Sequence, residues 1–405
     1  MNILFVTKGS FGSNSATGQM LNNLFDGLSE IKVLQYSLMP RDNGYRQLIS
    51  NVSEMQNVNY SVFCQIESVC NKKLLSSRKF KGVWAVIKRA CDFLDGLTPP
   101  HLSNIEIRGI KAFAPDVIYS LASDTKVLRI CNLLSSRLNI PIVLHNMDDF
   151  YNMKYGNRSI IRRIANHYLQ REYKKAYSHS KMSLAIGPKM QNEYSSTFNI
   201  PFDWVMNCVP DTASFPQYEP KDNISLIIFS GGLHGGRAET LAQIAKIIEG
   251  RDLKLEIFTS SMDRMNYNYL FSSFVNTKLL EYVKKEDMFT NLSRADVLLH
   301  VESYFPRYTM YFRLSMSTKI PEYMSVCRPI LCVGPSGIAT VDFIKEKKVG
   351  LVVNDISEFE ESISLISSVA ARVELVNNSI QIVSKDFFRS KMQIKLVNVI
   401  KQNLL

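Results

Sequence analysis

Residues 317–337 read STKIPEYMSVCRPILCVGPSG, and this stretch carries the clearest fold signal in the chain. Thr318 suits the position before a helix, and Pro321 suits its first turn, where a missing N–H is no loss. An Arg-Pro pair stops this helix, and the apolar run at 330–333 has the length of a buried strand. The glycine-containing turn that follows leads into another helical pattern. The stretch therefore predicts a helix, a buried strand and a loop, as found in parallel α/β sheets.

The same stretch holds an acid in a position that suits a nucleotide. Glu322 lies in the first turn of the predicted helix, where the helix dipole favours a carboxylate. A carboxylate can accept hydrogen bonds from both hydroxyls of a ribose, and N–H groups in the loop at Gly334 can face a phosphate. We therefore expect Glu322 and Gly334 to bind a nucleotide.

Strands and helices alternate along the rest of the chain, and the pattern occurs twice. In the first half, strands are predicted at 3–6, 32–36, 117–120, 141–145 and 182–186, and helices at 19–28, 126–138, 158–178 and 188–197. In the second half, strands are predicted at 225–229, 253–258, 279–283 and 297–301, and helices at 237–249 and 288–293. This alternation predicts an α/β fold with two doubly wound, parallel-sheet, Rossmann-like domains.

A proline-rich segment without periodicity separates the two halves. We expect an N-terminal domain at 1–210, a linker at 211–222, a C-terminal domain at 223–384 and a final helix at 385–405. Two such domains that face each other would form a cleft at the carboxyl ends of both sheets, where ligands bind in folds of this kind.

A second glycine loop lies at 230–236, between a predicted strand and a predicted helix. Gly231 and Gly232 let the backbone approach an anion, and Arg237 opens the helix that follows. A tight structural turn would explain the same glycines. The strand–loop–helix context favours phosphate binding.

Candidate site residues also lie at or after the ends of two predicted strands in the first half of the chain. His145 ends the strand at 141–145, and an imidazole there can bond a sugar hydroxyl or carry a proton. Asp148 and Asp149 come next; at most one of them is expected in the site, and we assign Asp148, although a turn cap explains it equally. Three more residues, from the loop after the first strand, are expected to line the acceptor side: Gly9, Ser10 and Gly12.

Charge is distributed unevenly over the 405 residues, whose net charge is +11. Residues 1–210 hold 25 Lys and Arg against 15 Asp and Glu, whereas the remainder holds 23 against 22. The segment 72–89 has seven basic residues and no acid, interleaved with apolar residues and Trp84. This pattern suggests an anionic partner such as a membrane surface. No nucleic-acid motif accompanies the charge, so a nucleic-acid partner is not expected.

Other features bear on location and metal content. No apolar run reaches the roughly 20 residues that span a bilayer, and the first residues lack the pattern of a signal peptide. Seven cysteines without a Cys-x-x-Cys pair fit reduced thiols. We expect a cytoplasmic protein, peripheral on the cytoplasmic face of the membrane. Neither an Asp-x-Asp nor a zinc-ligand spacing occurs, so we expect no metal and no cofactor.

The stretch 317–337 resembles the C-terminal signature of the group 1 glycosyltransferases of GT-B fold, a family-4-like, retaining type. Glu322 matches the second glutamate of that signature, and Leu314 occupies the position of the first. Gly232 stands where the family has an arginine after its glycine, so Arg237 and Lys319 are the nearest candidates to neutralise a diphosphate. Glu302, after the strand at 297–301, is a candidate to replace the missing acid.

The resemblance implies transfer of a sugar from a nucleotide-diphosphate donor to a saccharide or lipid-linked acceptor, in cell-envelope polysaccharide synthesis. It also implies that the last helix crosses back to the first domain. Two alternatives stay open. A nucleotide-sugar epimerase shares this fold, and a non-catalytic, glycosyltransferase-like binding subunit would explain the missing glutamate and arginine.

Overall fold

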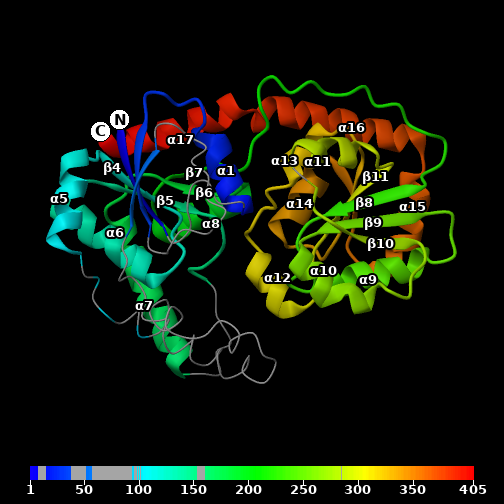
Figure 1. Ribbon diagram of the computed structural model, residues 1–405, viewed down its shortest axis with the longest axis horizontal. Coiled ribbons are helices and arrows are strands. Elements are labelled where there is room, and N and C mark those ends of the chain that lie inside the picture. The colour runs from blue at the N-terminus through cyan, green and yellow to red at the C-terminus, as the bar shows by residue number, and fades with distance from the viewer. Residues whose placement is uncertain are drawn as a thin grey trace. The chain divides into compact units, whose positions relative to one another are not determined.

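The computed structural model describes residues 1–7, 15–37, 52–56, 94, 98, 100, 102–152, 160–283 and 285–405. The chain divides into two compact units. The first unit comprises Met1–Met206 together with Gln393–Leu405, and the second comprises Asn207–Met392. In its described residues, each unit contains one parallel sheet flanked by helices (Figure 1).

The described part of the first unit has a seven-stranded parallel sheet of order β3-β2-β1-β4-β5-β6-β7. Its strands are β1 (Asn2–Thr7), β2 (Lys32–Ser37), β3 (Val52–Gln56), β4 (Val117–Ser120), β5 (Ile142–Asn146), β6 (Ser183–Ala185) and β7 (Phe202–Trp204). The helices between them are α1 (Ala16–Phe25), α5 (Asn104–Phe113), α6 (Thr125–Leu138), α7 (Ile160–Tyr177) and α8 (Pro188–Phe198). The central strands β1, β4 and β5 are buried on both faces, as a parallel sheet requires.

Local sequence explains where these helices begin and end. The Ser15 side chain accepts a hydrogen bond from the Gly18 N–H at 3.1 Å, so α1 begins earlier than the segment 19–28 predicted from apolar spacing. Ser103 and Glu106 form a reciprocal capping box at the start of α5. Asn139, in the left-handed conformation, ends α6.

The second unit has a six-stranded parallel sheet of order β10-β9-β8-β11-β12-β13 in its described residues. Its strands are β8 (Leu226–Ser230), β9 (Lys254–Thr259), β10 (Thr277–Glu281), β11 (Val297–Val301), β12 (Ile330–Val333) and β13 (Gly350–Val353). The helices are α9 (Arg237–Ile248), α10 (Ser261–Tyr267), α11 (Lys285–Ser293), α12 (Pro306–Phe312), α13 (Ile320–Ser325), α14 (Ala339–Glu346), α15 (Phe359–Ile366) and α16 (Val369–Ile382). Short 3-10 turns lie at Asn268–Leu270 and Ile356–Glu358, and a π-helical turn lies at Val383–Phe387.

The last helix, α17 (Arg389–Leu404), packs against the first unit from Gln393 onward. The Gln393 side chain donates hydrogen bonds to the backbone oxygens of Leu24 and Asp26. Near the end of the helix, Asn403 donates to the Met182 oxygen at 2.8 Å and accepts from the Lys181 N–H at 2.7 Å. These polar contacts fix the helix along its length to elements far away in the sequence.

The structure confirms the predicted fold class of two doubly wound parallel sheets. Strand β10 occupies Thr277–Glu281 rather than the predicted 279–283, because its pairing with β9 begins at Thr277. Three strands at sheet edges were not predicted: β3, β7 and β13. The division between the units falls between Met206 and Asn207, before the expected linker at 211–222.

Parallel register brings chain segments that follow different strands to one edge of the second sheet. Val301 of β11 pairs with Val333 of β12, so the residues that follow them, Glu302 and Gly334, are neighbours. The loop at 230–236 follows β8, which pairs with the other side of β11. This edge is where ligands bind in open α/β sheets.

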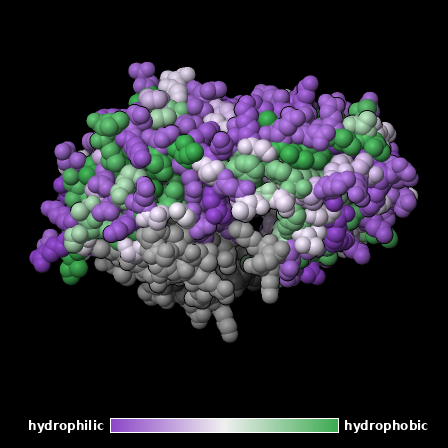
Figure 2. Space-filling view, turned by 90° about the horizontal axis from the view of Figure 1, so that it is seen from above, coloured by the Kyte–Doolittle hydropathy of each residue, from purple (hydrophilic) through white to green (hydrophobic). Residues whose placement is uncertain are grey.

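The described helices include none that is long and apolar enough to cross a bilayer. The face shown in Figure 2 is largely hydrophilic, with hydrophobic residues in scattered patches.

Candidate functional site

The candidate site lies at the carboxyl edge of the second sheet, and its centre is the glycine loop after β8. A Cβ atom on Gly231 would overlap the Lys319 ammonium nitrogen, so only glycine leaves the lysine its place. The Gly231 N–H donates to the Phe258 oxygen at 2.9 Å, which fixes the loop to β9. The lysine nitrogen also lies 5.3 Å from the centre of the Phe229 ring. The structure thus brings the predicted residues Gly231 and Lys319 together.

The rest of the loop presents backbone N–H groups. Gly235 and Gly236 have φ values of 74° and 84°, a conformation that other residues rarely adopt. At Gly232 a Cβ would come within 2.7 Å of the His234 ring. Within the described ranges, no hydrogen bond engages the N–H groups of these three glycines or of His234. Unpaired N–H groups at the start of the twelve-residue helix α9 provide donors for an anion.

Arg237, the first residue of α9, belongs to a buried ionic network. Its guanidinium donates to Glu302 Oε2 at 2.9 Å and to the Val301 oxygen at 3.2 Å, and it lies 4.6 Å from the centre of the Phe312 ring. His300 Nε2 donates to the other carboxylate oxygen, Oε1, at 3.1 Å. Arg237 is therefore held in place before any ligand binds.

The network keeps Glu302 ionised. Burial alone would raise the pKa of this carboxyl group, but the charge of Arg237 and the bond from His300 lower it to about 2. Burial lowers the pKa of His300, so its imidazole is neutral near pH 7. Both oxygens of Glu302 accept bonds from protein groups, which makes it a support for Arg237.

Lys319 has a strongly perturbed environment. Burial of its ammonium group, and then repulsion by Arg237, lower its pKa to about 7, while Glu302 and Glu322 act in the opposite direction. No hydrogen bond to its nitrogen occurs among the described residues. An anion beside Lys319 would stabilise its charged form. The lysine therefore favours a bound phosphate.

Glu322 lies in the first turn of α13, three residues after Lys319 in the chain. Its Oε1 atom accepts a hydrogen bond from the Asn207 side chain at 3.0 Å. The neighbouring Tyr323 hydroxyl accepts from the Ser230 N–H at 2.8 Å and donates to the Ser230 oxygen at 3.3 Å. Tyr323 therefore fixes α13, and with it Glu322, against the end of β8.

Gly334 belongs to the same edge, but its N–H is engaged. A Cβ on Gly334 would come within 2.9 Å of the Glu302 Cβ, so the absence of a side chain gives Glu302 its space. The Gly334 N–H donates to the Val353 oxygen at 3.0 Å. In this structure Gly334 therefore supports Glu302 and does not offer its N–H to an anion.

In the first unit, His145 is fully buried and both ring nitrogens have partners. Its Nε2 donates to the Val205 oxygen at 2.8 Å, which leaves Nδ1 to accept from the Tyr119 hydroxyl at 2.5 Å. Burial lowers the pKa of His145 to about 4. These contacts describe a neutral structural histidine, and the geometry gives no support to the predicted sugar contact.

The two acids after β5 differ in exposure. Asp149 is buried and accepts a hydrogen bond from the Tyr194 hydroxyl at 2.8 Å. Asp148 is partly exposed, and its backbone oxygen accepts from the Phe150 N–H. Asp149 therefore has a structural role in the core, and Asp148 stays the candidate site residue of the two.

Several predicted features lie outside the described residues. These are the acceptor-side residues Gly9, Ser10 and Gly12, and the basic segment 72–89. Within the ranges that the structure describes, no group of His, Cys, Asp and Glu has an arrangement that would hold a metal ion.

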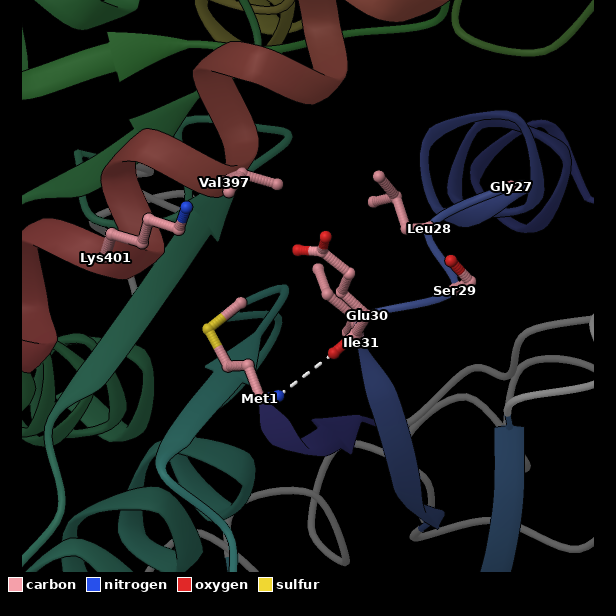
Figure 3. Close-up of a pocket in the computed structure, with 8 residues that line it drawn as sticks. All are labelled: Met1, Gly27, Leu28, Ser29, Glu30, Ile31, Val397 and Lys401. Carbon is pink, nitrogen blue, oxygen red and sulfur yellow. Dashed lines mark hydrogen bonds between the residues drawn. The ribbon is translucent and has the colours of Figure 1, made fainter.

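A cavity of about 360 Å³ lies in the first unit, away from all the predicted site residues. Figure 3 shows the turn at 27–31, Met1 and two residues of α17, Val397 and Lys401, around it. It lies where β1 and β2 begin, at the opposite end of these strands from their carboxyl edge. Ligands in doubly wound folds bind at the carboxyl edge, so this cavity is not our candidate site.

Sequence reasoning missed three residues of the site: Asn207, His300 and Tyr323. His300 is the one polar residue of the buried strand β11, and a buried histidine there signals a nearby partner. Asn207 and Tyr323 reach their partners across more than 90 residues of chain, and no local pattern indicates such contacts.

No protein-family model matches the sequence, and a search of curated protein sequences found no match. Solved structures do match. The Anabaena protein Alr3699/HepE in complex with UDP has a TM-score of 0.68 at 12% identity, over 99% of this chain and 100% of that one. A Rickettsia africae glycosyltransferase has a TM-score of 0.64 at 12% identity, over 100% and 98%. The lipopolysaccharide outer core galactosyltransferase WaaB, in its apo form, has a TM-score of 0.58 at 14% identity, over 99% of both chains. At these identities the likeness shows the fold, which is the GT-B architecture of two Rossmann-like domains.

Proposed function

We propose that this protein is a glycosyltransferase that uses a nucleotide-diphosphate sugar. The observation that carries the proposal is the convergence of Lys319, Arg237 and unpaired loop N–H groups at the carboxyl edge of the second sheet, beside Glu322. Positive charge and N–H donors suit a diphosphate, and a carboxylate suits the two hydroxyls of a ribose. The Anabaena structures of the same fold, named as complexes with UDP and with UDP-glucose, support this choice of ligand.

The same residues suit the chemistry of transfer. As the bond between the sugar C1 and the diphosphate oxygen breaks, its electron pair leaves with the diphosphate. Lys319, Arg237 and the N–H groups of the loop then stabilise the negative charge that develops there. The acceptor oxygen bonds to C1 and loses its proton to a base or to water. We propose that two protein cations supply the stabilisation, without a metal ion, and that the sugar configuration is retained.

The acceptor is proposed to be a saccharide or a lipid-linked saccharide of the cell envelope, met at the cytoplasmic face of a membrane. Support comes from the basic character of the first half of the chain and from α7. That helix exposes Ile160 and Ile164, with exposed fractions of 73% and 40%, beside exposed Arg163 and Arg171. Apolar and cationic side chains together suit the surface of an anionic leaflet.

One observation favours a second candidate, a non-catalytic binding subunit. Leu314, at the position of the first glutamate of the resembled signature, is fully buried in the core. Glu302 does not replace that acid, because both its oxygens accept bonds from His300 and Arg237. A subunit that binds the donor without transfer would fit these facts.

A screen of nucleotide sugars separates the two candidates. Thermal shift identifies the donor that stabilises the protein, and mass spectrometry then follows products with soluble and lipid-linked acceptors, with and without EDTA. A glycosyltransferase yields a product heavier by one sugar and releases the nucleoside diphosphate. Donor binding without product, under every acceptor mixture, would support the binding subunit instead. Turnover of the sugar without an acceptor would indicate an epimerase.

A further inference from the structure

Asn207 makes an unusual pair of contacts at the start of α13. Its side chain is buried, with an exposed fraction of 4% for the residue. The side-chain nitrogen donates to the Thr318 oxygen at 2.9 Å and to Glu322 Oε1 at 3.0 Å. One amide group thus uses both of its N–H donors on one corner of the second unit. That corner includes Lys319, which lies between the two accepting residues.

The backbone around Asn207 is fixed independently of this corner. The residues on either side of it, Met206 and Cys208, are buried. Val209 donates its N–H to the Phe387 oxygen at 3.0 Å and accepts from the Arg389 N–H at 2.8 Å. The amide of Asn207 is therefore held by a segment whose backbone is already ordered, so its orientation does not depend on a ligand.

Helix α13 needs such support because it is short. It has six residues, and its cap residue, Lys319, makes no side-chain capping bond. Isolated helices of this length are unstable, so outside contacts hold this one in place. Tyr323 fixes its position through Ser230, and Asn207 fixes the carboxylate itself.

We propose that Asn207 is a positioning residue, which orients the Glu322 carboxylate for the ligand. This inference rests on the proposed function, since it assigns Glu322 to the ribose. A donated hydrogen bond favours the ionised form of a carboxylate and fixes its plane. The ribose hydroxyls then meet a carboxylate that is already oriented, which lowers the entropic cost of binding the ligand.

An aspartate at position 207 tests this role without changing the shape of the side chain. Asn207→Asp places a second carboxylate about 3 Å from that of Glu322, and the negative charge on one carboxylate disfavours ionisation of the other. At high pH they repel each other, and near pH 5 they share a proton that restores the hydrogen bond. A residue that only stabilises the fold would give no such recovery of ligand binding.

The experiment is calorimetric titration with UDP, GDP and ADP at pH 5 to 8, with every affinity divided by the wild-type value at the same pH. Asn207→Ala is expected to bind about tenfold more weakly throughout. Asn207→Asp is expected to bind weakly at pH 8 and to approach wild type at pH 5. The matched control is Asn403→Ala, which removes another buried amide whose partners lie in the first unit. Its melting temperature should fall without a change in nucleotide affinity.

Each outcome bears on the inference. Nucleotide binding by wild type with no change in either Asn207 variant, at any pH, would overturn the positioning role alone. Weaker binding by Asn207→Asp that does not recover at low pH would also overturn it. If Asn207→Ala does not fold, the isosteric Asn207→Asp still decides the question. No binding of any nucleotide by the wild-type protein would refute the proposed function and this inference together.

Discussion

At the scale of single residues, Lys319 is the most informative group in the chain. Its ammonium lies against a glycine and beside an aromatic ring, and burial, followed by repulsion from Arg237, lowers its pKa to about 7. Other charged or titratable groups act on it as well: Glu302, Glu322 and His234. A lysine near half protonation at neutral pH makes anion binding depend on pH.

We predict that nucleotide affinity falls as the pH rises above about 7. The anion binds the protonated lysine, the free lysine loses its proton above its lowered pKa of about 7, and binding must then take up a proton. The loss approaches tenfold per pH unit. Titration with UDP from pH 7 to 9, in buffers of different ionisation enthalpy, measures both the slope and the proton uptake. Lys319→Arg, which stays charged, should flatten the slope; equal slopes with no uptake would exclude this role.

His145 shows why residue type alone does not identify a catalytic group. Its position near the end of a core strand suggested a sugar contact, yet both its nitrogens bond to protein atoms. The partners, Tyr119 and Val205, lie far apart in the sequence. No local pattern could therefore distinguish a buried histidine with two partners from one open to a ligand.

We predict that His145 affects stability more than ligand binding. The pKa of the imidazole is lowered from 6.5 unfolded to about 4 folded, so the unfolded chain binds more protons between these values. Wild-type stability should thus decrease as the pH falls from 6.5 towards 4, by up to about 3 kcal/mol from this group. Urea unfolding of wild type and His145→Gln measures the difference. A loss of turnover in the variant, with unchanged stability at every pH, would instead support a catalytic role.

At the scale of elements, the glycine loop after β8 illustrates how far sequence patterns reach. Strand, loop and helix were all predicted, and so was an anionic ligand near Gly231 and Arg237. The sequence could not show that Gly231 leaves space for the side chain of Lys319, a residue that lies far away in the chain. Edge strands such as β13 were missed because they are short: β13 has four residues, and the first of them is a glycine. The described elements of the core were predicted well, since buried parallel strands have a strong local signature.

Gly231→Ala is predicted to reduce nucleotide affinity with little effect on folding. The new methyl group would meet the flexible end of Lys319, which can move away, so the fold survives while the ammonium leaves its place. We expect a loss of about tenfold in UDP affinity, the value of one charged contact. Gly250→Ala is the matched control, because φ there is 77° and no atom lies within 4 Å. It should lower the melting temperature and leave the affinity unchanged; the reverse pattern would contradict the assignment.

At the scale of the whole molecule, charge asymmetry is the feature that the sequence shows and the fold does not explain. The excess of positive charge lies in residues 1–210, and the described part includes the exposed basic face of α7. An acceptor at an anionic membrane surface, as proposed, would explain this excess, because positive charge attracts the protein to such a surface.

We predict that charge on the first half of the chain holds the protein reversibly at anionic vesicles. Each Lys or Arg near the surface contributes about 1 kcal/mol, and salt weakens the attraction. Co-sedimentation at low and high salt compares wild type with a variant in which Lys72, Lys73, Arg78, Lys79 and Lys81 are serine. The control replaces exposed lysines of the second unit: Lys246, Lys278, Lys345 and Lys347. Equal sedimentation of all three proteins with anionic vesicles would exclude the membrane role and favour a soluble acceptor.

The central claim is that the carboxyl edge of the second sheet binds a nucleotide-diphosphate sugar through Glu322, and calorimetry with Glu322→Gln tests it most directly. The substitution keeps the shape of the side chain and removes its charge, and a hydrogen bond to a charged group is worth about 1.5–3 kcal/mol. Titration of UDP and UDP-glucose into both proteins should show affinity lower by roughly tenfold or more in the variant, at an unchanged melting temperature. Equal affinities in the two proteins, or no binding of either nucleotide by wild type, would contradict the claim.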